Sequence, residues 1–142
     1  MTAVNTESRL AQRRMDLVRR HVEVENAQDI DGLLATFKAP RYEFAAGDLV
    51  FDGPDAVRQL WVEQYAALPD FHVDLRRMHH ADDVVFCEVA ITATHAGDFM
   101  GVPPTDRPLA WDAACLFEFD GDLLVKERVY FDSAMILAQI NA

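Results

Sequence analysis

Four polar residues near the C-terminal end of the chain are of the types that carry out acid–base chemistry. They lie in the stretch DAACLFEFDGDLLVKERVYFD and are Asp112, Arg128, Tyr130 and Asp132. Desolvation raises the pKa of a carboxylic acid and a neighbouring arginine lowers it, so such a set can be tuned for proton transfer near neutral pH. The same residues can also form a plain cross-strand ion pair on an exposed or subunit-contacting face of a sheet.

The turn between the two halves of this stretch decides which of these side chains meet. With Gly121 at the left-handed position of a three-residue turn, apolar residues share one face of the hairpin and polar residues share the other. This register places Asp112 opposite Arg128, with Tyr130 and Asp132 further along the same face. A two-residue turn would mix apolar and charged side chains on both faces, so we predict the first register.

Asp132 and His95 each have a structural alternative. Asp132 directly precedes the last expected helix, where an aspartate commonly caps the free backbone N–H groups. His95 ends an apolar strand, and a histidine on an apolar face is usually a satisfied core residue. However, His95 also begins the loop THAGDFMGVPPTDR, in which Phe99 and Met100 stand among glycines and prolines. A loop that folds back over the mouth of a cavity needs both residue types, which favours a position of His95 beside a pocket.

Helices come first and strands follow in the pattern of apolar residues. A spacing of three and four residues predicts helices, alternation predicts strands, and glycine and proline mark the turns. The expected segments are helices over residues 8–27, 30–37, 54–68 and 132–140, a hairpin over 41–51, and strands over 71–78, 84–95, 109–119 and 123–131. This order predicts an α+β fold in which the helices cover one face of a curved antiparallel sheet.

The concave face of such a sheet is the expected place for a ligand pocket. A curved sheet cannot fill its own concavity, so the helices and the loop over residues 95–107 must cover it and leave room for a small molecule. Trp61 and Tyr65 lie on the apolar stripe of the helix over 54–68. We therefore expect five residues to line the pocket, namely Trp61, Tyr65, Phe99, Met100 and Leu116.

Length and charge restrict the classes of protein to which this chain can belong. Its 142 residues fit one domain, and 51% of them are hydrophobic, which allows one sizeable core. A formal net charge of −11 repels phosphate backbones and argues against nucleic acid as a partner. No apolar stretch is long enough to span a membrane, and the N-terminus lacks the apolar core of a signal peptide. We expect a cytoplasmic protein with a single domain over residues 1–142.

Other residues with reactive side chains fit structural roles. Cys87 and Cys115 lie in expected strands and are interpreted as small buried hydrophobic residues. The segment HHADD over residues 79–83 resembles a set of metal ligands in type, but alternation sends His79 and His80 to opposite faces of a strand. The chain has no phosphate-binding loop and no zinc-ligand spacing, so we expect neither a metal nor a cofactor.

The loop THAGDFMGVPPTDR, together with FEFDGDLLVKERVYFD and the closing ILAQI, resembles the SnoaL-like polyketide cyclases. These cyclases belong to the superfamily named after nuclear transport factor 2, and the resemblance spans nearly the whole chain. It implies a cone-shaped α+β fold, a homodimer and catalysis without a cofactor. It also implies that Asp132 is the general acid–base of an intramolecular aldol closure, and that His95 and residues 97–104 border the pocket. Arg128 stands where these cyclases usually have a tryptophan.

The first functional hypothesis is a small cofactor-independent enzyme, of cyclase or isomerase type, that abstracts a proton from a hydrophobic carbonyl-bearing molecule. Asp132 would be the base and Arg128 its electrostatic partner. Tyr130 or His95 would donate a hydrogen bond to the developing enolate. One alternative is an epoxide hydrolase that uses Asp112, Arg128 and Asp132. The other is a non-catalytic ligand-binding or dimerisation module, in which these charged residues lie outside the pocket.

Overall fold

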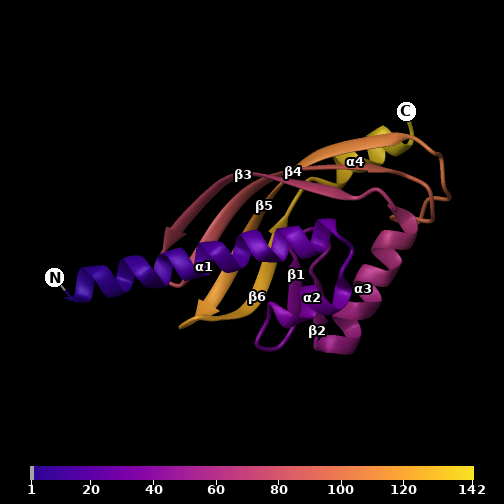
Figure 1. Ribbon diagram of the computed structural model, residues 1–142. Coiled ribbons are helices and arrows are strands. Elements are labelled where there is room, and N and C mark those ends of the chain that lie inside the picture. The colour runs from indigo at the N-terminus through magenta and orange to yellow at the C-terminus, as the bar shows by residue number, and fades with distance from the viewer. Residues whose placement is uncertain (1) are drawn as a thin grey trace.

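The computed structural model describes the backbone of residues 2–142 and the side chains from Thr6 onward. Its elements follow the predicted order of helices, hairpin, helix, strands and closing helix (Figure 1). They are α1 (Thr2–Asn26), α2 (Ile30–Ala35), β1 (Arg41–Phe44), β2 (Leu49–Asp52), α3 (Pro54–Ala67), β3 (His72–Ala81), β4 (Val84–Thr94), β5 (Pro108–Asp120), β6 (Leu123–Tyr130) and α4 (Ser133–Ile140). The first helix begins earlier than predicted, and the other elements agree with their predicted segments to within a few residues.

All the named strands form one curved sheet in the order β2-β1-β6-β5-β4-β3. Consecutive strands from β3 to β6 pair antiparallel, as the predicted meander requires, and β1 pairs antiparallel with β2. The pairing of β1 with β6 is parallel, which the sequence pattern did not predict. It places Tyr42 of β1 beside Glu127 of β6, although the two residues are far apart in the chain.

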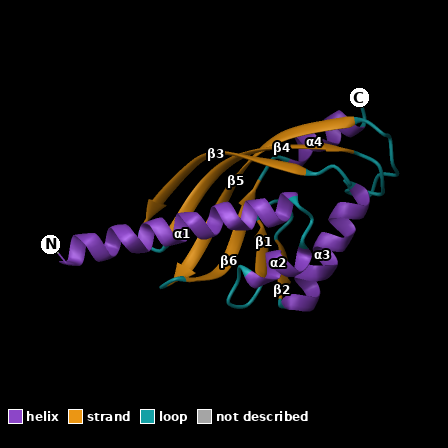
Figure 2. Ribbon diagram, in the orientation of Figure 1, coloured by secondary structure: helices purple, strands orange, loops and turns teal. Residues whose placement is uncertain are grey.

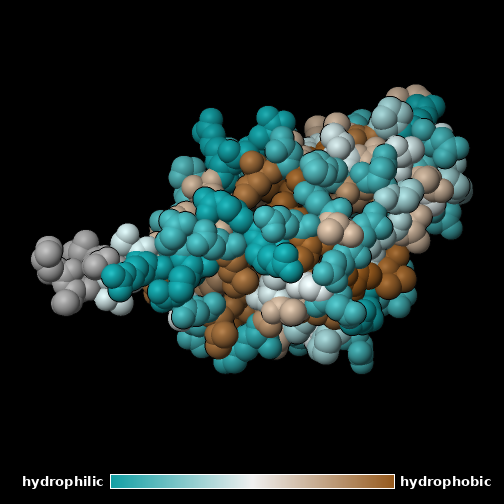
Figure 3. Space-filling view, viewed as in Figure 1, coloured by the Kyte–Doolittle hydropathy of each residue, from teal (hydrophilic) through white to brown (hydrophobic). Residues whose placement is uncertain are grey.

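The helices cover the concave face of the sheet, and the outer face carries no helix in the described chain (Figures 1 and 2). α1 runs across the sheet and contacts β3 and β4, α3 contacts the hairpin of β1 and β2, and α4 contacts β5. Residues along β4 and β5 alternate between buried and more exposed, because alternate side chains face the helices. Hydrophilic residues cover much of the molecular face that carries α1 (Figure 3). None of the helices in the described residues is both long and apolar enough to cross a membrane.

Arg14 fixes α1 to two strand turns at one end of the sheet. Its side chain is only 3% exposed although it carries a charge. The guanidinium donates to the backbone oxygens of Gly121 and Asp82, each at 2.9 Å, and to the Asp83 carboxylate at 3.1 Å. The Nε2 atom of His80 lies 3.1 Å from the same guanidinium. His80, Asp82 and Asp83 of the segment HHADD therefore anchor the first helix.

The register predicted for the final hairpin is wrong. Leu116, and not Asp112, lies opposite Arg128. Asp112 lies further along β5, beside Ala90 of β4. The cross-strand pair expected between Asp112 and Arg128 is therefore not formed.

A β-bulge explains why the alternation of side chains favoured the wrong turn. The strands are joined by a two-residue turn at residues 121–122, and the pairing then shifts next to Phe119. Phe119 and Leu124 lie opposite each other and are both buried beside the turn. Without the shift, the rest of β6 would carry Lys126 and Arg128 on the inner face, beside the apolar residues of β5. That mixture of apolar and charged side chains was the reason to expect a turn other than a two-residue one.

Candidate active site

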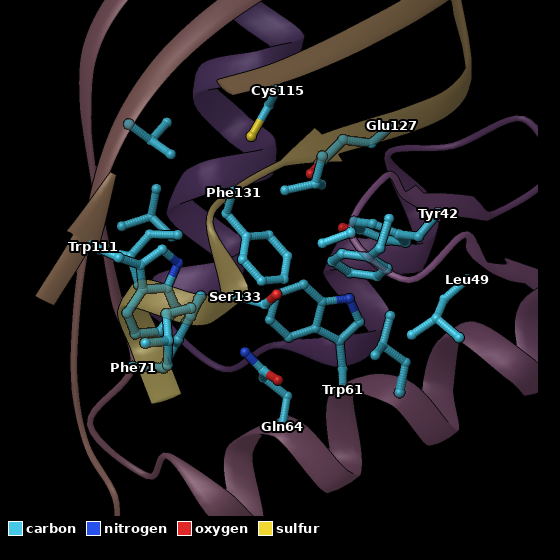
Figure 4. A pocket seen from close by; sticks show the side chains of 18 of the residues that line it. Tyr42, Leu49, Trp61, Gln64, Phe71, Trp111, Cys115, Glu127, Phe131 and Ser133 are labelled. Carbon is cyan, nitrogen blue, oxygen red and sulfur yellow. The ribbon is translucent and has the colours of Figure 1, made fainter. Parts of the chain in front are cut away.

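A cavity of about 380 Å³ lies between the concave face of the sheet, the helices and the hairpin of β1 and β2. Its walls are mostly aromatic and aliphatic (Figure 4). The aromatic lining residues include Tyr42, Phe44, Trp61, Phe71, Trp111 and Phe131. A space of this size and character suits a hydrophobic small molecule, because burial of apolar surface supplies most of the binding energy there.

Four polar residues form a buried acid–base cluster at the inner end of this cavity. They are His21 and Glu25 of α1, Tyr42 of β1 and Glu127 of β6, and all four side chains are buried. His21 and Glu25 are one helical turn apart, so they project from the same face of α1. Tyr42 and Glu127 are neighbours through the parallel pairing of their strands. Three of the four, Glu25, Tyr42 and Glu127, line the cavity itself.

Hydrogen bonds fix the orientation of the His21 ring. Its Nδ1 atom lies 2.8 Å from the hydroxyl oxygen of Thr36. That hydroxyl donates its own hydrogen to the backbone oxygen of Leu33 at 2.6 Å, so it can only accept from His21. Nδ1 therefore carries a hydrogen, and Nε2 points at the other members of the cluster.

Three oxygen atoms surround the Nε2 atom of His21. The Tyr42 hydroxyl lies at 2.9 Å, a carboxylate oxygen of Glu127 at 3.0 Å and one of Glu25 at 3.4 Å. The rings of Phe37 and Phe117 pack edge-on against the imidazole, with centroid distances of 5.4 and 5.2 Å. The cluster is therefore a charged group enclosed by hydrophobic side chains, where electrostatic interactions are strong.

Burial and mutual contact shift the pKa values of the cluster. Burial lowers the pKa of His21, but the neighbouring carboxylates of Glu127 and Glu25 raise it, and the net pKa is about 9. Burial raises the pKa of Glu25 to about 7, against the opposing effect of His21. Burial also raises the pKa of Tyr42 well above its ordinary value. At neutral pH, His21 is therefore positively charged, Tyr42 keeps its proton and Glu25 is close to the midpoint of its titration.

Two buried polar atoms at the cavity have no hydrogen-bond partner. They are Oε1 of Glu127 and Nε1 of Trp61, and they are the only such side-chain atoms among the described residues. Oε1 of Glu127 lies 3.0 Å from Nε2 of His21, which gives charge attraction, but the alignment does not make a hydrogen bond. A buried polar group without a partner is costly and rare in folded proteins, so each of the two atoms needs an explanation.

His21, Glu25 and Glu127 are also the one group of potential metal ligands that lie close together in the described residues. One ligand atom from each lies within 4.8 Å of the others. An imidazole binds a metal ion through an unprotonated nitrogen. Both ring nitrogens of His21 hold hydrogens at neutral pH, because Nδ1 donates to Thr36 and the pKa is about 9. The arrangement therefore favours shared protons over a metal ion.

Asp132 and Asp112, two residues of the predicted acid–base set, lie outside the cavity. Asp132 is exposed, and its carboxylate accepts hydrogen bonds from the backbone N–H groups of Ala134 and Met135 at 3.0 and 3.2 Å. It caps α4, as its structural alternative predicted. Asp112 is exposed on the outer face of β5.

Arg128 and Tyr130 belong to a polar network on the outer face of the sheet. Nε of Arg128 donates to the Tyr130 hydroxyl at 2.8 Å, and another guanidinium nitrogen donates to Glu43 at 3.0 Å. Burial raises the pKa of Glu43, but Arg41, Arg128 and Lys126 outweigh this effect and lower it. The network is satisfied on its own side of the sheet. The structure therefore does not assemble the aspartate–arginine–aspartate set that the epoxide-hydrolase hypothesis requires.

His95 is completely buried, and both of its ring nitrogens have partners. Nδ1 lies 2.9 Å from the hydroxyl of Thr105, and Nε2 lies 3.2 Å from the backbone oxygen of Val102. These contacts hold the loop after β4 in a folded shape, and two of its residues, Phe99 and Met100, line the cavity. His95 itself does not line it, which agrees with the alternative that it is a satisfied core residue.

Three of the five residues predicted to line the pocket do so, namely Trp61, Phe99 and Met100. Tyr65 is buried beside Trp61, and its hydroxyl donates to the backbone oxygen of Glu25 at 2.7 Å. It supports the helix that carries the acid–base cluster without lining the cavity. Leu116 lies on the outer face of the sheet, opposite Arg128, so its expected place in the pocket was wrong.

Sequence reasoning missed all members of the buried acid–base cluster. The available signal was a polar side chain at an inward position of an apolar element. His21 and Glu25 lie on the face of α1 that also carries Val18 and Val22. Glu127 occupies a buried position in the alternating pattern of β6. A charged residue at such a position is expensive unless it is paired, so it deserves consideration as a functional residue.

A family model for the SnoaL-like polyketide cyclases matches residues 15–140 of the chain. The protein therefore belongs to the SnoaL-like polyketide cyclase family. This result confirms the resemblance that the loop after β4 and the last two strands showed in the sequence. No match was found among curated protein sequences.

Solved structures show the same fold. AclR from Streptomyces galilaeus, for which a hydroxylase activity has been suggested, is 23% identical with a TM-score of 0.79, over 92% of this chain and 82% of that one. A protein from Jannaschia sp. CCS1, suggested to be a SnoaL-like polyketide cyclase, is 17% identical with a TM-score of 0.82, over 94% of both chains. A protein with a ketosteroid isomerase-like fold from Catenulispora acidiphila is 20% identical with a TM-score of 0.72, over 87% and 90%. At these identities the likeness establishes the fold alone.

Proposed function

We propose that this protein is a cofactor-independent acid–base enzyme that abstracts a proton beside the carbonyl group of a hydrophobic small molecule, as a cyclase or an isomerase. The observation that carries the proposal is the buried Oε1 atom of Glu127, which has no hydrogen-bond partner and belongs to the lining of an otherwise largely apolar cavity. A carboxylate oxygen in this position can accept a proton from a bound ligand.

The surrounding residues support this role of Glu127. Its Oε1 atom takes the proton, and the electron pair of the broken C–H bond moves into an enolate. The cation of His21, 3.0 Å away, balances one of the two carboxylates before and after the transfer. Glu25, with a pKa of about 7, can exchange a proton with the rest of the cluster at neutral pH. Return of the proton to another carbon gives an isomer. Alternatively, the enolate carbon attacks a second carbonyl of the same molecule, a C–C bond closes the ring, and the alkoxide that results takes the proton back from Glu127.

The placement of the charged residues also bears on the alternatives. A non-catalytic module would have Asp112, Arg128 and Asp132 outside the cavity, as the structure has them. However, an entirely apolar cavity would favour that alternative, and two carboxylates and a phenol line this one. The polar end of the cavity therefore favours an enzyme over a carrier.

Deuterium exchange into 2-tetralone is a direct test. This ketone is bicyclic and apolar, and the hydrogens beside its carbonyl are acidic enough for exchange to be followed by proton NMR in D₂O near neutral pH. We expect the wild-type protein to accelerate the exchange well above the rate in buffer, with saturation as the ketone concentration rises. Exchange at the buffer rate, under conditions in which the ketone binds, would contradict the proposal.

Asp132→Asn distinguishes the two candidate bases in the same assay. Asparagine is an equally good helix cap, so the variant should lose no more than a few tenths of a kcal/mol of folding free energy. We expect it to keep most of the wild-type exchange rate, because the carboxylate lies outside the cavity. If the variant loses exchange although it unfolds at the wild-type temperature, Asp132 is the base and Glu127 is not.

We also propose that the protein forms a homodimer, as the family resemblance implies. The outer face of the sheet carries no helix in the described chain, and the polar network of Arg41, Glu43, Lys126, Arg128 and Tyr130 lies on it. Sedimentation equilibrium should give twice the chain mass at micromolar concentration. A monomer at that concentration would contradict this expectation.

A further inference from the structure

We propose that the indole N–H of Trp61 is a hydrogen-bond donor to the ligand, and that it works with Oε1 of Glu127 as a two-point recognition site. The ligand group that fits this site accepts one hydrogen bond and offers one hydrogen. Alcohols, phenols and enols of ring-bearing hydrophobic molecules have this property, and so does an enolisable ketone as it loses its proton. The relevance of this site to catalysis rests on the proposed function. Binding of the ligand by the two atoms does not depend on catalysis.

The first observation is that Nε1 of Trp61 is buried without a partner. An indole nitrogen can only donate a hydrogen bond, so its partner must be an acceptor. The Tyr42 hydroxyl is a neighbouring acceptor, close enough for the indole to lower the pKa of Tyr42 against the larger effect of burial, but the two groups are not aligned for a hydrogen bond. That hydroxyl lies 2.9 Å from Nε2 of His21.

The second observation is that the Trp61 ring is held firmly in place. It is 5% exposed, and the rings of Tyr42, Tyr65 and Phe71 pack against it with centroid distances of 5.8, 5.3 and 5.8 Å. The indole therefore cannot turn away to donate elsewhere without disturbing the core. Its N–H is a fixed feature of the cavity wall, which is the condition for a donor that is oriented before the ligand arrives.

The third observation is that the two atoms without partners belong to one cavity and have complementary chemistry. Trp61 offers a hydrogen, and Glu127 offers a lone pair. In Figure 4 the nitrogen of Trp61 lies on the side of its ring that faces Tyr42, whereas Gln64 and Ser133 lie on the other side. No lysine, arginine or histidine belongs to the described lining. An oxygen that carries or gains a negative charge can therefore accept a hydrogen bond from Trp61 beside the cluster.

Equilibrium dialysis with three naphthalene derivatives tests this recognition. 2-Naphthol can accept from Trp61 and donate to Glu127, 2-methoxynaphthalene can only accept, and naphthalene can do neither. We expect the wild-type protein to bind them in this order of affinity. Trp61→Phe should weaken binding of 2-naphthol and of 2-methoxynaphthalene by about 3- to 10-fold, the usual worth of one hydrogen bond. It should change binding of naphthalene by less than about twofold, since phenylalanine keeps an aromatic wall.

Phe71→Leu is the matched control, because Phe71 lines the same cavity and packs against Trp61 but has no polar side-chain atom. It should weaken binding of all three probes by a similar factor. Glu127→Gln should weaken binding of 2-naphthol more than that of 2-methoxynaphthalene. Circular dichroism and thermal unfolding establish that each variant is folded at the temperature of the dialysis.

Equal weakening of all three probes by Trp61→Phe would overturn the inference, and so would failure of the wild-type protein to prefer 2-naphthol over naphthalene. The outcome is separate from that of the exchange assay. If Trp61→Phe discriminates between the probes while 2-tetralone does not exchange, the recognition stands and the proposed chemistry fails. If 2-tetralone exchanges and Trp61→Phe does not discriminate, the chemistry stands and its oxygen donor is another group.

Discussion

Glu127→Gln is expected to slow exchange of deuterium into 2-tetralone by about 10²- to 10⁴-fold, the usual contribution of a positioned general base. Glutamine has nearly the shape of glutamate, so the cavity and the packing of β6 are retained. Its amide cannot take a proton at neutral pH. Because Oε1 of Glu127 is the carboxylate oxygen at the cavity without a hydrogen-bond partner, we expect the other lining residues to replace it poorly.

Two further variants make this result specific. Glu88→Gln changes an exposed glutamate on the outer side of β4 and should leave the exchange rate within about twofold of wild type, as is usual for surface substitutions. Glu127→Asp keeps a carboxylate but withdraws it by one methylene, so it should lose less activity than Glu127→Gln. A folded Glu127→Gln protein that exchanges 2-tetralone at the wild-type rate would show that a different group accepts the proton.

The free energy of unfolding should fall as the pH rises from about 4.5 to about 9. His21 has a folded-state pKa of about 9 against an ordinary value of 6.5, and Glu25 has one of about 7 against 4.5. Both shifts are upward, so the folded protein binds more protons than the unfolded chain between these values. The stabilisation from His21 is complete below pH 6.5 and is lost by pH 9. The cost of ionising buried Glu25 begins above pH 4.5 and is complete near pH 7.

The slope of this dependence reaches about 1.4 kcal/mol per pH unit for each group that differs by one bound proton. Urea unfolding at intervals between pH 5 and pH 9 measures it directly. His21→Gln removes the titrating imidazole and should flatten the curve between pH 6.5 and pH 9, at the price of lower stability at pH 6. A wild-type stability that is constant over this range would contradict the pKa shifts of the cluster.

The sequence was sufficient to predict the elements and the fold class for a physical reason. Burial on one face produces a helical stripe around Trp61 and strict alternation around Cys87, and such local patterns can be read from the chain. The bulge beside Phe119 made the predicted hairpin register wrong, because one extra residue reverses which side chains face inward. The parallel pairing of β1 with β6 joins segments that are distant in sequence, and no local pattern encodes it.

The candidate site was harder to predict, because its members are distant in the sequence and no local pattern joins them. Arg128 and Asp132 are conspicuous in the sequence as charged residues near the end of a strand, yet each is satisfied outside the cavity by Glu43 or by the first amides of α4. The buried cluster depends on His21, Glu25 and Glu127, which meet only through tertiary packing. Inward-facing charges on apolar elements are the local sign of such a cluster. They are less conspicuous in the sequence than the outward-facing charges near the end of a strand.

The parallel pairing of β1 with β6 has a consequence for synthesis of the protein. Glu127 lies on β6, which is synthesised after the other named strands, and its partners in the cluster come from the first helix and the first hairpin. A nascent chain that lacks β6 lacks one wall of the cavity. In such a chain His21, Glu25 and Tyr42 do not yet contact Glu127. The four members of the cluster therefore come together only when the sheet closes, so a chain that lacks β6 also lacks the proposed base.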